Sequence, residues 1–176
     1  MTKETKMSTE ETEGTPRIRA AWATATEQLD VGFPQPLSSA DVVDRLLILD
    51  LVNHYGWTYD ERRIDVMRAI FTADGVFEGS FWGEQSAPPS NGIEAIIEWQ
   101  EYWMGQQTDQ RRHLLSNVIV KEQTAERAVV LANMAITSSE GTTAALAATG
   151  FYRFTLRKEE SQWRIERLFA GFDGPF

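Results

Sequence analysis

The spacing of hydrophobic residues changes its period partway along the chain. Between residues 38 and 104 most apolar side chains recur every three or four positions, as they do on one face of a helix. From residue 111 onward, stretches rich in Val, Ile, Leu and Phe alternate with short polar turns, which is typical of strands. Helices followed by a run of long strands predict an α+β domain, with helices on one face of an antiparallel sheet.

Three helices are expected in the first part of this domain. The longest begins at Ser38, where Asp41 completes a capping box, and it continues to Asp60. Its apolar stripe comprises Val43, Leu47, Ile48, Leu51, Val52 and Tyr55. The remaining elements are a short helix at 64–71, a strand at 76–82, a helix at 93–104, and strands at about 111–121, 126–138, 144–158 and 162–172.

The N-terminal residues differ from the rest of the chain. Residues 1–14 are polar and have no hydrophobic period, which is typical of disorder. Thr15 and Pro16 then mark the start of a short helix, whose apolar stripe reaches Leu29. This helix either packs on the domain surface, covers a pocket or reaches a neighbouring subunit. We therefore expect a tail with an accessory helix over residues 1–37 and one domain over 38–176.

Composition narrows the class of protein. The 176 residues suffice for one domain with a substantial core. A formal net charge of −9 disfavours nucleic acids and anionic membrane surfaces as partners. The chain has no cysteine, no secretory signal and no membrane span, so we expect a cytoplasmic protein. Two histidines without paired-ligand spacing, and no phosphate-binding loop, predict that no metal or other cofactor is used.

The candidate chemistry centres on Asp60, at the end of the long helix, and His113, early in a strand. In an apolar neighbourhood either group needs a partner, because burying it alone is costly. A carboxylate beside an imidazole fixes the tautomer of the ring and makes it a better base. The alternatives are a core histidine bonded to a backbone carbonyl, and a helix-terminal aspartate paired with Arg62 or Arg63.

Strand alternation adds further candidates. His113 and Asn117 share one face of their strand, and Asn133 shares a face of the next strand with Leu131. If these two faces coincide, His113 and Asn133 are polar points on an apolar wall, as in many small-molecule sites. Aromatic residues that form either core or substrate wall are Trp57, Phe77, Trp82, Trp99, Trp103 and Tyr152.

The order of these motifs resembles the SnoaL-like branch of the NTF2-like superfamily. The shared features are Tyr55-x4-Asp60, the run from Phe71 to Gly79, Arg112-His113-Leu-Leu-Ser-Asn117 and a closing Trp163-Arg-Ile. The resemblance covers roughly residues 38–172. It implies a curved sheet that helices wrap into a cone around a hydrophobic pocket.

The same resemblance implies roles for individual residues. The dehydratases of this group share an Asp–His dyad, which corresponds to Asp60 and His113 here, and they have polar groups at the positions of Tyr55 and Asn133. His113 would remove a proton next to a carbonyl, while Tyr55 and Asn133 stabilise the enolate oxygen. The resemblance therefore implies a cofactor-independent dehydratase for a hydrophobic polycyclic or polyketide-like molecule. An isomerase or cyclase, and a non-catalytic ligand-binding or assembly module, are the alternatives.

We also expect self-association. On the parity above, the outer face of the sheet carries Leu114, Val118 and Val120, and also Val130, Ala132, Met134 and Ile136. Symmetric assembly is the common way to bury an apolar face of this kind. The resembling dehydratases form trimers and the isomerases form dimers, so we expect a homo-oligomer and favour the trimer.

Overall fold

A computed structural model of the chain describes residues 29–39, 41–81, 84–85 and 88–174. The predicted disordered tail, all of the predicted accessory helix except Leu29, and Trp82 lie outside the described residues. Residues 29–39 contain no helix or strand. No helix in the described part of the chain combines the length and the apolar character needed to cross a membrane.

The three helices of the described residues match the prediction closely. They are α1 (Asp41–Asp60), α2 (Ile64–Ile70) and α3 (Ile93–Gln106). One of the two bonds of the predicted capping box is present: the Ser38 backbone N–H donates to Asp41 Oδ2 over 3.1 Å. Ser38 Oγ donates to the same oxygen over 2.6 Å, and the Asp41 N–H donates to the Ser38 carbonyl instead of to Oγ. This pairing satisfies groups that would otherwise lack partners where the helix begins.

The apolar stripe of α1 packs along only part of its length. Ile48, Leu51, Val52 and Tyr55 are buried, as predicted, whereas Val43 and Leu47 are exposed. The prediction that the whole stripe faces the core is therefore wrong for the first two turns. An apolar pattern alone cannot show how far the sheet extends beneath a helix.

The strands form one curved sheet. They are β1 (Phe71–Phe81), β2 (Glu84–Gln85), β3 (Ser90–Asn91), β4 (Gln110–Gln123), β5 (Arg127–Glu140), β6 (Thr143–Glu159) and β7 (Gln162–Phe172). Their order is β2-β1-β7-β6-β5-β4, and β3 pairs with β1. The pairs along β4 to β7 are antiparallel, while β1 runs parallel to β7. The four long C-terminal strands were predicted to within two residues at each end.

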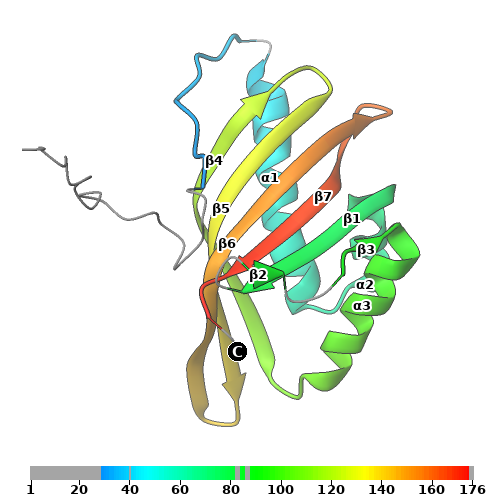
Figure 1. Ribbon diagram of the computed structural model, residues 1–176, viewed down its shortest axis with the longest axis vertical. Coiled ribbons are helices and arrows are strands. Elements are labelled where there is room, and N and C mark those ends of the chain that lie inside the picture. The colour runs from blue at the N-terminus through cyan, green and yellow to red at the C-terminus, as the bar shows by residue number, and fades with distance from the viewer. Residues whose placement is uncertain (1–28, 40, 82–83, 86–87, 175–176) are drawn as a thin grey trace, which may run out of the picture.

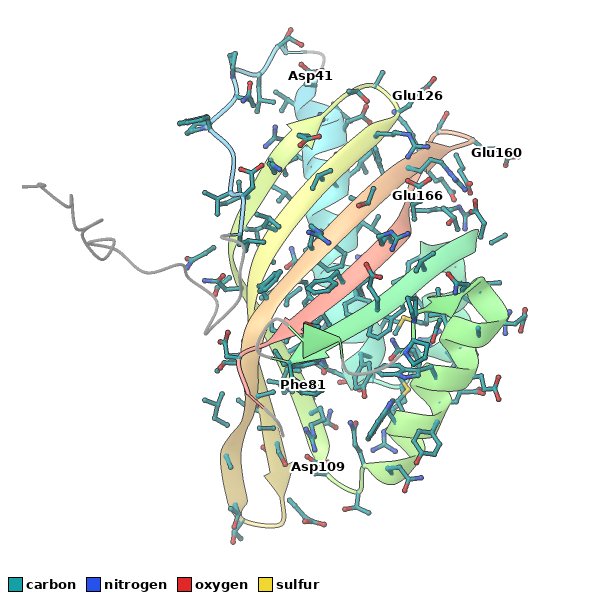
Figure 2. The ribbon with its side chains drawn as sticks, viewed as in Figure 1. Asp41, Phe81, Asp109, Glu126, Glu160 and Glu166 are labelled. Carbon is teal, nitrogen blue, oxygen red and sulfur yellow. The ribbon has the colours of Figure 1, made fainter. Side chains whose placement is uncertain are left out.

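The helices lie on one side of the sheet, as the α+β prediction requires. Figure 1 shows α1 behind the sheet and α2 and α3 beside β1, so that helices and strands enclose the core. Fully buried side chains from both layers meet there, among them Tyr55, Phe71, Phe154 and Ile165. Figure 2 places the turns of Glu126 and Glu160 at one end of the sheet and Asp109 at the other.

The pairing of β4 with β5 corrects the predicted parity. His113 lies opposite Ile136, and Ser116 lies opposite Asn133. Residues directly opposite in an antiparallel pair point to the same face, so His113 shares its face with Ile136 and not with Asn133. Asn133 is exposed, and the predicted common face is wrong.

The same register changes the expected outer face of the sheet. Val130, Ala132, Met134 and Ile136 are buried in the core and do not form an outward patch. A bulge in β4 at Asn117, which has a φ of 49°, also turns Val118 and Val120 toward the core. Of the residues named for this patch, only Leu114 is exposed. The homo-oligomer, whether trimer or dimer, loses this support and stays a prediction.

Candidate active site

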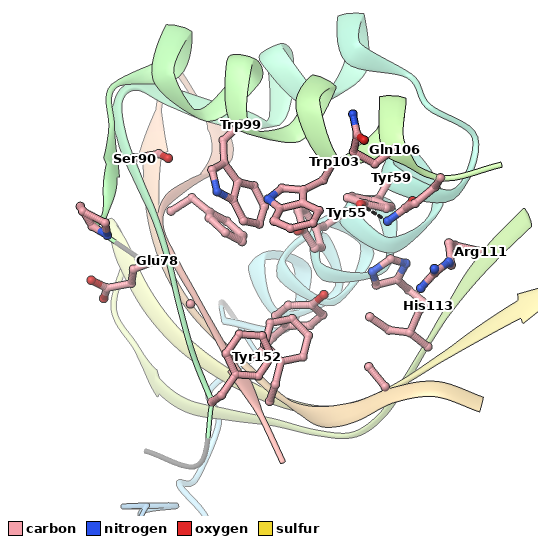
Figure 3. A pocket seen from close by; sticks show the side chains of 18 residues that line it. Tyr55, Tyr59, Glu78, Ser90, Trp99, Trp103, Gln106, Arg111, His113 and Tyr152 are labelled. Carbon is pink, nitrogen blue, oxygen red and sulfur yellow. Dashed lines mark hydrogen bonds between the residues drawn. The ribbon is translucent and has the colours of Figure 1, made fainter. Parts of the chain in front are cut away.

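A cavity of about 460 Å³ opens between the concave face of the sheet, α1 and α3. Its volume falls within the range of small-molecule sites. The apolar and aromatic part of its wall consists chiefly of Tyr55, Tyr59, Phe77, Phe81, Pro88, Trp99, Trp103, Ile136, Ala148, Tyr152 and Phe172. Polar side chains in the wall are those of Glu78, Ser90, Gln106, Gln107, Arg111 and His113. Figure 3 shows the two tryptophans from α3 facing His113 and Tyr152 across the cavity.

Asp60 and His113 meet at one side of this cavity. Nδ1 of the imidazole lies 2.6 Å from Oδ1 of the carboxylate, and the His113 backbone N–H donates to Oδ2 over 2.8 Å. The two side chains are only 3% and 5% exposed, for His113 and Asp60 respectively. The predicted contact is confirmed. The alternative partners are engaged elsewhere, since Arg63 pairs with Asp65 and Arg62 donates to the carbonyl of Gln107.

Local backbone features bring the two residues together. Asp60 is the last residue of α1, and the chain turns there because Arg62 adopts the left-handed region, with a φ of 53°. Gly56, one turn earlier, faces β4: a Cβ at this position would lie 3.2 Å from Cβ of His113. The missing side chain allows the helix to approach the strand closely enough for the carboxylate to reach the imidazole.

These contacts specify one tautomer of His113. An ionised carboxylate only accepts hydrogen bonds, so the bond to Asp60 assigns the ring hydrogen to Nδ1. Nε2 then carries the lone pair, and none of the described residues donates a hydrogen bond to it. Because His113 lines the cavity, this nitrogen is available to a bound molecule. The arrangement suits a general base that later acts as an acid.

Three tyrosines surround the imidazole. The ring centroids of Tyr59, Tyr152 and Tyr55 lie 4.8, 6.3 and 6.4 Å from that of His113. Burial raises the pKa of all three hydroxyl groups above the usual value, most strongly for Tyr55 and Tyr152. They stay protonated at neutral pH. The Tyr55 and Tyr152 hydroxyls hydrogen-bond with each other, so that pair has one hydrogen left to donate to a ligand oxygen. The Tyr59 hydroxyl accepts from Gln107 Nε2 over 3.0 Å, which leaves its own hydrogen free.

The structure sorts the predicted site residues into two groups. Those that line the cavity are Tyr55, Phe77, Trp103, His113 and Tyr152, with Asp60 directly behind His113. Those that do not are Trp57, Asn117 and Asn133.

The positions of these three residues outside the cavity have geometric causes. Trp57 is 64% exposed because it lies two positions after Tyr55, which is more than half a turn of helix. The guanidinium of Arg112 lies 5.7 Å from its ring, outside the cavity. Asn117 is exposed at the bulge, and Asn133 is exposed on the far face of the sheet.

The sequence prediction missed several cavity residues, notably Tyr59 and Arg111, whereas Trp99, named as either core or substrate wall, does line the cavity. Tyr59 had a detectable signal, because it follows Tyr55 by one helical turn. Arg111 lies two residues before His113 in β4 and therefore on the same face.

Comparison with known proteins gives a consistent result. The SnoaL-like domain family matches residues 40–168. A search of curated proteins found no match.

Solved structures share the fold. A proposed aromatic ring hydroxylase from Novosphingobium aromaticivorans is 26% identical, with a TM-score of 0.64 over 76% of this chain and 92% of that one. A proposed scytalone dehydratase from the same organism is 17% identical, with a TM-score of 0.64 over 76% and 86%. An NTF2-like protein with a cystatin-like fold, also from this organism, is 17% identical, with a TM-score of 0.60 over 77% and 90%.

The family match covers most of the chain, and the cone of curved sheet and helices is the fold of these structures. The chain belongs to the SnoaL-like domain family, on the NTF2-like fold.

Proposed function

We propose that the protein is a cofactor-independent lyase that eliminates water from a hydrophobic polycyclic or polyketide-like molecule. The observation that carries this proposal is the 2.6 Å contact of Asp60 with Nδ1 of His113, beside an aromatic cavity. It provides a base whose tautomer is fixed and whose second nitrogen is open to a ligand. A non-catalytic binding module would need no buried carboxylate to orient an imidazole.

The proposed elimination uses the same imidazole twice. Nε2 of His113 takes a proton from the carbon next to a carbonyl, and the negative charge moves onto the carbonyl oxygen as an enolate. When the enolate collapses, a carbon–carbon double bond forms and the carbon–oxygen bond to the β-hydroxyl breaks. The imidazolium returns its proton to this hydroxyl, which departs as water. Asp60 stabilises the imidazolium between the two transfers.

Hydrogen-bond donors for the enolate come from the tyrosines. Tyr55 and Tyr152 have raised pKa values, chiefly because they are buried, and their hydroxyls hydrogen-bond with each other. The pair therefore keeps its protons and has one hydroxyl hydrogen left to donate to the enolate. Donors that point at developing negative charge lower the barrier to reaction. Tyr55 keeps the role that we expected for it, and the tyrosine hydroxyls replace Asn133. Phe77, Trp103 and Tyr152 form the substrate wall.

An isomerase or a cyclase is the alternative. Both reactions begin with the same proton removal, and they differ in what the enolate does next. The similarity to a proposed scytalone dehydratase is one reason to favour elimination.

Substituted 3-hydroxy-1-tetralones test the proposal, because loss of water converts them into fluorescent 1-naphthols. We expect His113→Ala to lower turnover by about 10²–10⁴-fold, the usual contribution of general acid/base catalysis. Tyr55→Phe should lower it less, since the ring and its packing remain. Turnover of His113→Ala within a few-fold of wild type would refute the mechanism. Deuterium uptake from D2O without naphthol formation would favour the isomerase.

A further inference from the structure

Arg111 places a positive charge in the wall of an otherwise aromatic cavity. It precedes His113 by two residues in an unbroken stretch of β4, so both side chains project from the same face. Figure 3 shows them side by side at one side of the cavity. The two Cα atoms are about 7 Å apart, twice the rise per residue of a strand. The mechanism proposed above makes no use of this guanidinium.

Asp109 forms an ion pair with the guanidinium of Arg111. Its Oδ2 lies 2.5 Å from Nε of the guanidinium, in an ion pair whose geometry is off the line of a hydrogen bond. Burial acts to raise the pKa of the Asp109 carboxyl, but contacts with Ser138 and Arg111 outweigh it and bring the pKa below its usual value. Asp109 therefore stays ionised and fixes the edge of the guanidinium that carries Nε, which we call its inner edge; the outer edge carries Nη1 and Nη2.

The outer edge of the guanidinium has no partner within the described part of the chain. Arg111 is only 21% exposed, yet neither Nη1 nor Nη2 donates to any described residue. A guanidinium presents its N–H groups as a planar fork that matches a carboxylate. Leaving such donors unpaired in a cavity closed by a ligand is costly, so a ligand that fills the cavity should bring an acceptor to them.

Charge is distributed unevenly around the cavity. Glu78 lies on the opposite side from Arg111 and pairs with Arg167 over 3.0 Å. Asp109 and Arg167 compensate these two charges, so the asymmetry lies in the groups that line the cavity: Arg111 offers hydrogen-bond donors and Glu78 offers acceptor oxygens. An anionic group of a ligand can accept from Arg111 and cannot bond to Glu78, which orients the molecule. The net charge of the whole chain is −9, so any preference for an anion must come from this local arrangement.

We infer that Arg111 binds a carboxylate of the substrate, and that the substrate class is an aromatic or polycyclic acid. The inference rests on the proposed function only in taking this cavity as the substrate site. The short spacing between Arg111 and His113 places the acid group and the carbon that His113 deprotonates on the same or adjacent rings. Arg111 is thus a specificity-determining residue, distinct from the acid/base pair.

Binding of 2-naphthoate and of 2-naphthamide, measured by calorimetry, tests the inference without turnover. The two probes have nearly the same size and differ in charge. Wild type should bind the naphthoate at least about tenfold more tightly, as a charge-assisted hydrogen-bond pair implies. Arg111→Met should abolish this preference and leave naphthamide binding within a few-fold.

Matched variants identify the source of the preference. Arg112→Met removes the same kind of charge from the neighbouring position, where Arg112 pairs with Glu61 on the other face, and should leave the preference intact. Arg111→Lys keeps the charge without the fork and should give an intermediate preference. It also serves as the readout if Arg111→Met fails to fold.

Three results would overturn the inference: no preference in wild type, an unchanged preference in the Arg111 variants, or loss of the preference in His113→Ala. The last result would assign the anion to the imidazole. A preference that depends on Arg111 supports the inference even where no tetralone is turned over, so the two proposals fail separately.

Discussion

Replacing Asp60 by Asn preserves the shape of the side chain and changes its hydrogen bonding. The carboxylate accepts from Nδ1 of His113 with one oxygen and from the backbone N–H with the other. Asn has one acceptor oxygen and one NH2 group. If its oxygen keeps the backbone bond, the NH2 group faces Nδ1. Nδ1 must then become an acceptor, and the ring hydrogen moves to Nε2, where it blocks the proposed base.

The expected size of the effect follows from the burial of the pair. Replacing a hydrogen bond to a buried charge by one between neutral groups costs about 1–1.5 kcal/mol of the free energy of unfolding. For a domain of this size each kcal/mol lowers Tm by about 2–4 °C, so Asp60→Asn should lower Tm by roughly 2–6 °C. Turnover should fall by about 10²–10⁴-fold, because the wrong tautomer cannot take a proton.

Nitrogen-15 NMR of histidine-labelled protein measures the tautomer directly. The chain has two histidines, and His54 is exposed on α1, with its Nδ1 3.3 Å from Asp50. We expect wild-type His113 to carry its hydrogen on Nδ1 and the Asp60→Asn variant to carry it on Nε2. Asp50→Asn is the matched control and should change only the His54 signals. The reasoning fails if Asp60→Asn leaves both the His113 tautomer and Tm unchanged.

Three further predictions concern packing, pH and the corrected site. Gly56→Ala should lower turnover and change Tm only slightly, because the gain in helix propensity, about 1 kcal/mol, is offset by close contact of the new methyl group with His113. A rise in Tm of several degrees at full activity would contradict that contact. The pKa of Asp44 is lowered, chiefly by its hydrogen bond with Lys158. Ionised Asp44 therefore stabilises the folded state at pH values above the unfolded pKa near 3.8, and this stabilisation is lost as the pH falls through the lower folded pKa. Urea unfolding of Asp44→Asn should therefore lose less stability below about pH 4 than wild type, and parallel curves would refute this. Asn133→Ala should bind 2-naphthoate and turn over tetralones within a few-fold of wild type, since an exposed residue on the far face touches neither.

Local patterns predicted the elements well because their causes are local. The capping pair at Ser38 and Asp41, and the change from helical to strand periodicity, depend on neighbours a few residues away. The contact of Asp60 with His113 is not local, and it followed from the resemblance of ordered motifs rather than from periodicity. Gly56 shows what a single sequence conceals, since only the approach of β4 explains a glycine on the buried face of this helix.

The hydrophobic pattern of β5 could not show which face of the sheet Asn133 lies on. The stretch from Ala128 to Ile136 is apolar on both faces, so hydrophobicity does not select which alternation points inward. The register of a strand pair sets that choice, and a shift by one residue reverses every side chain. Arg111 was missed for a different reason: a charged residue near a candidate base is usually taken as solvated, and its burial in the cavity wall follows only from the fold.

The bulge at Asn117 makes β4 behave as two strands joined end to end. Before it, the odd-numbered positions face inward and carry Arg111 and His113. Between this bulge and a second register shift after Val120, the even-numbered positions face inward and carry Val118 and Val120. One extra residue therefore allows the same strand to supply a reactive surface at one end and a sealed core at the other. The number of residues between His113 and Val118 decides whether both side chains point inward. Deleting one of these residues would place either the imidazole or the two valines on the outer face of the sheet.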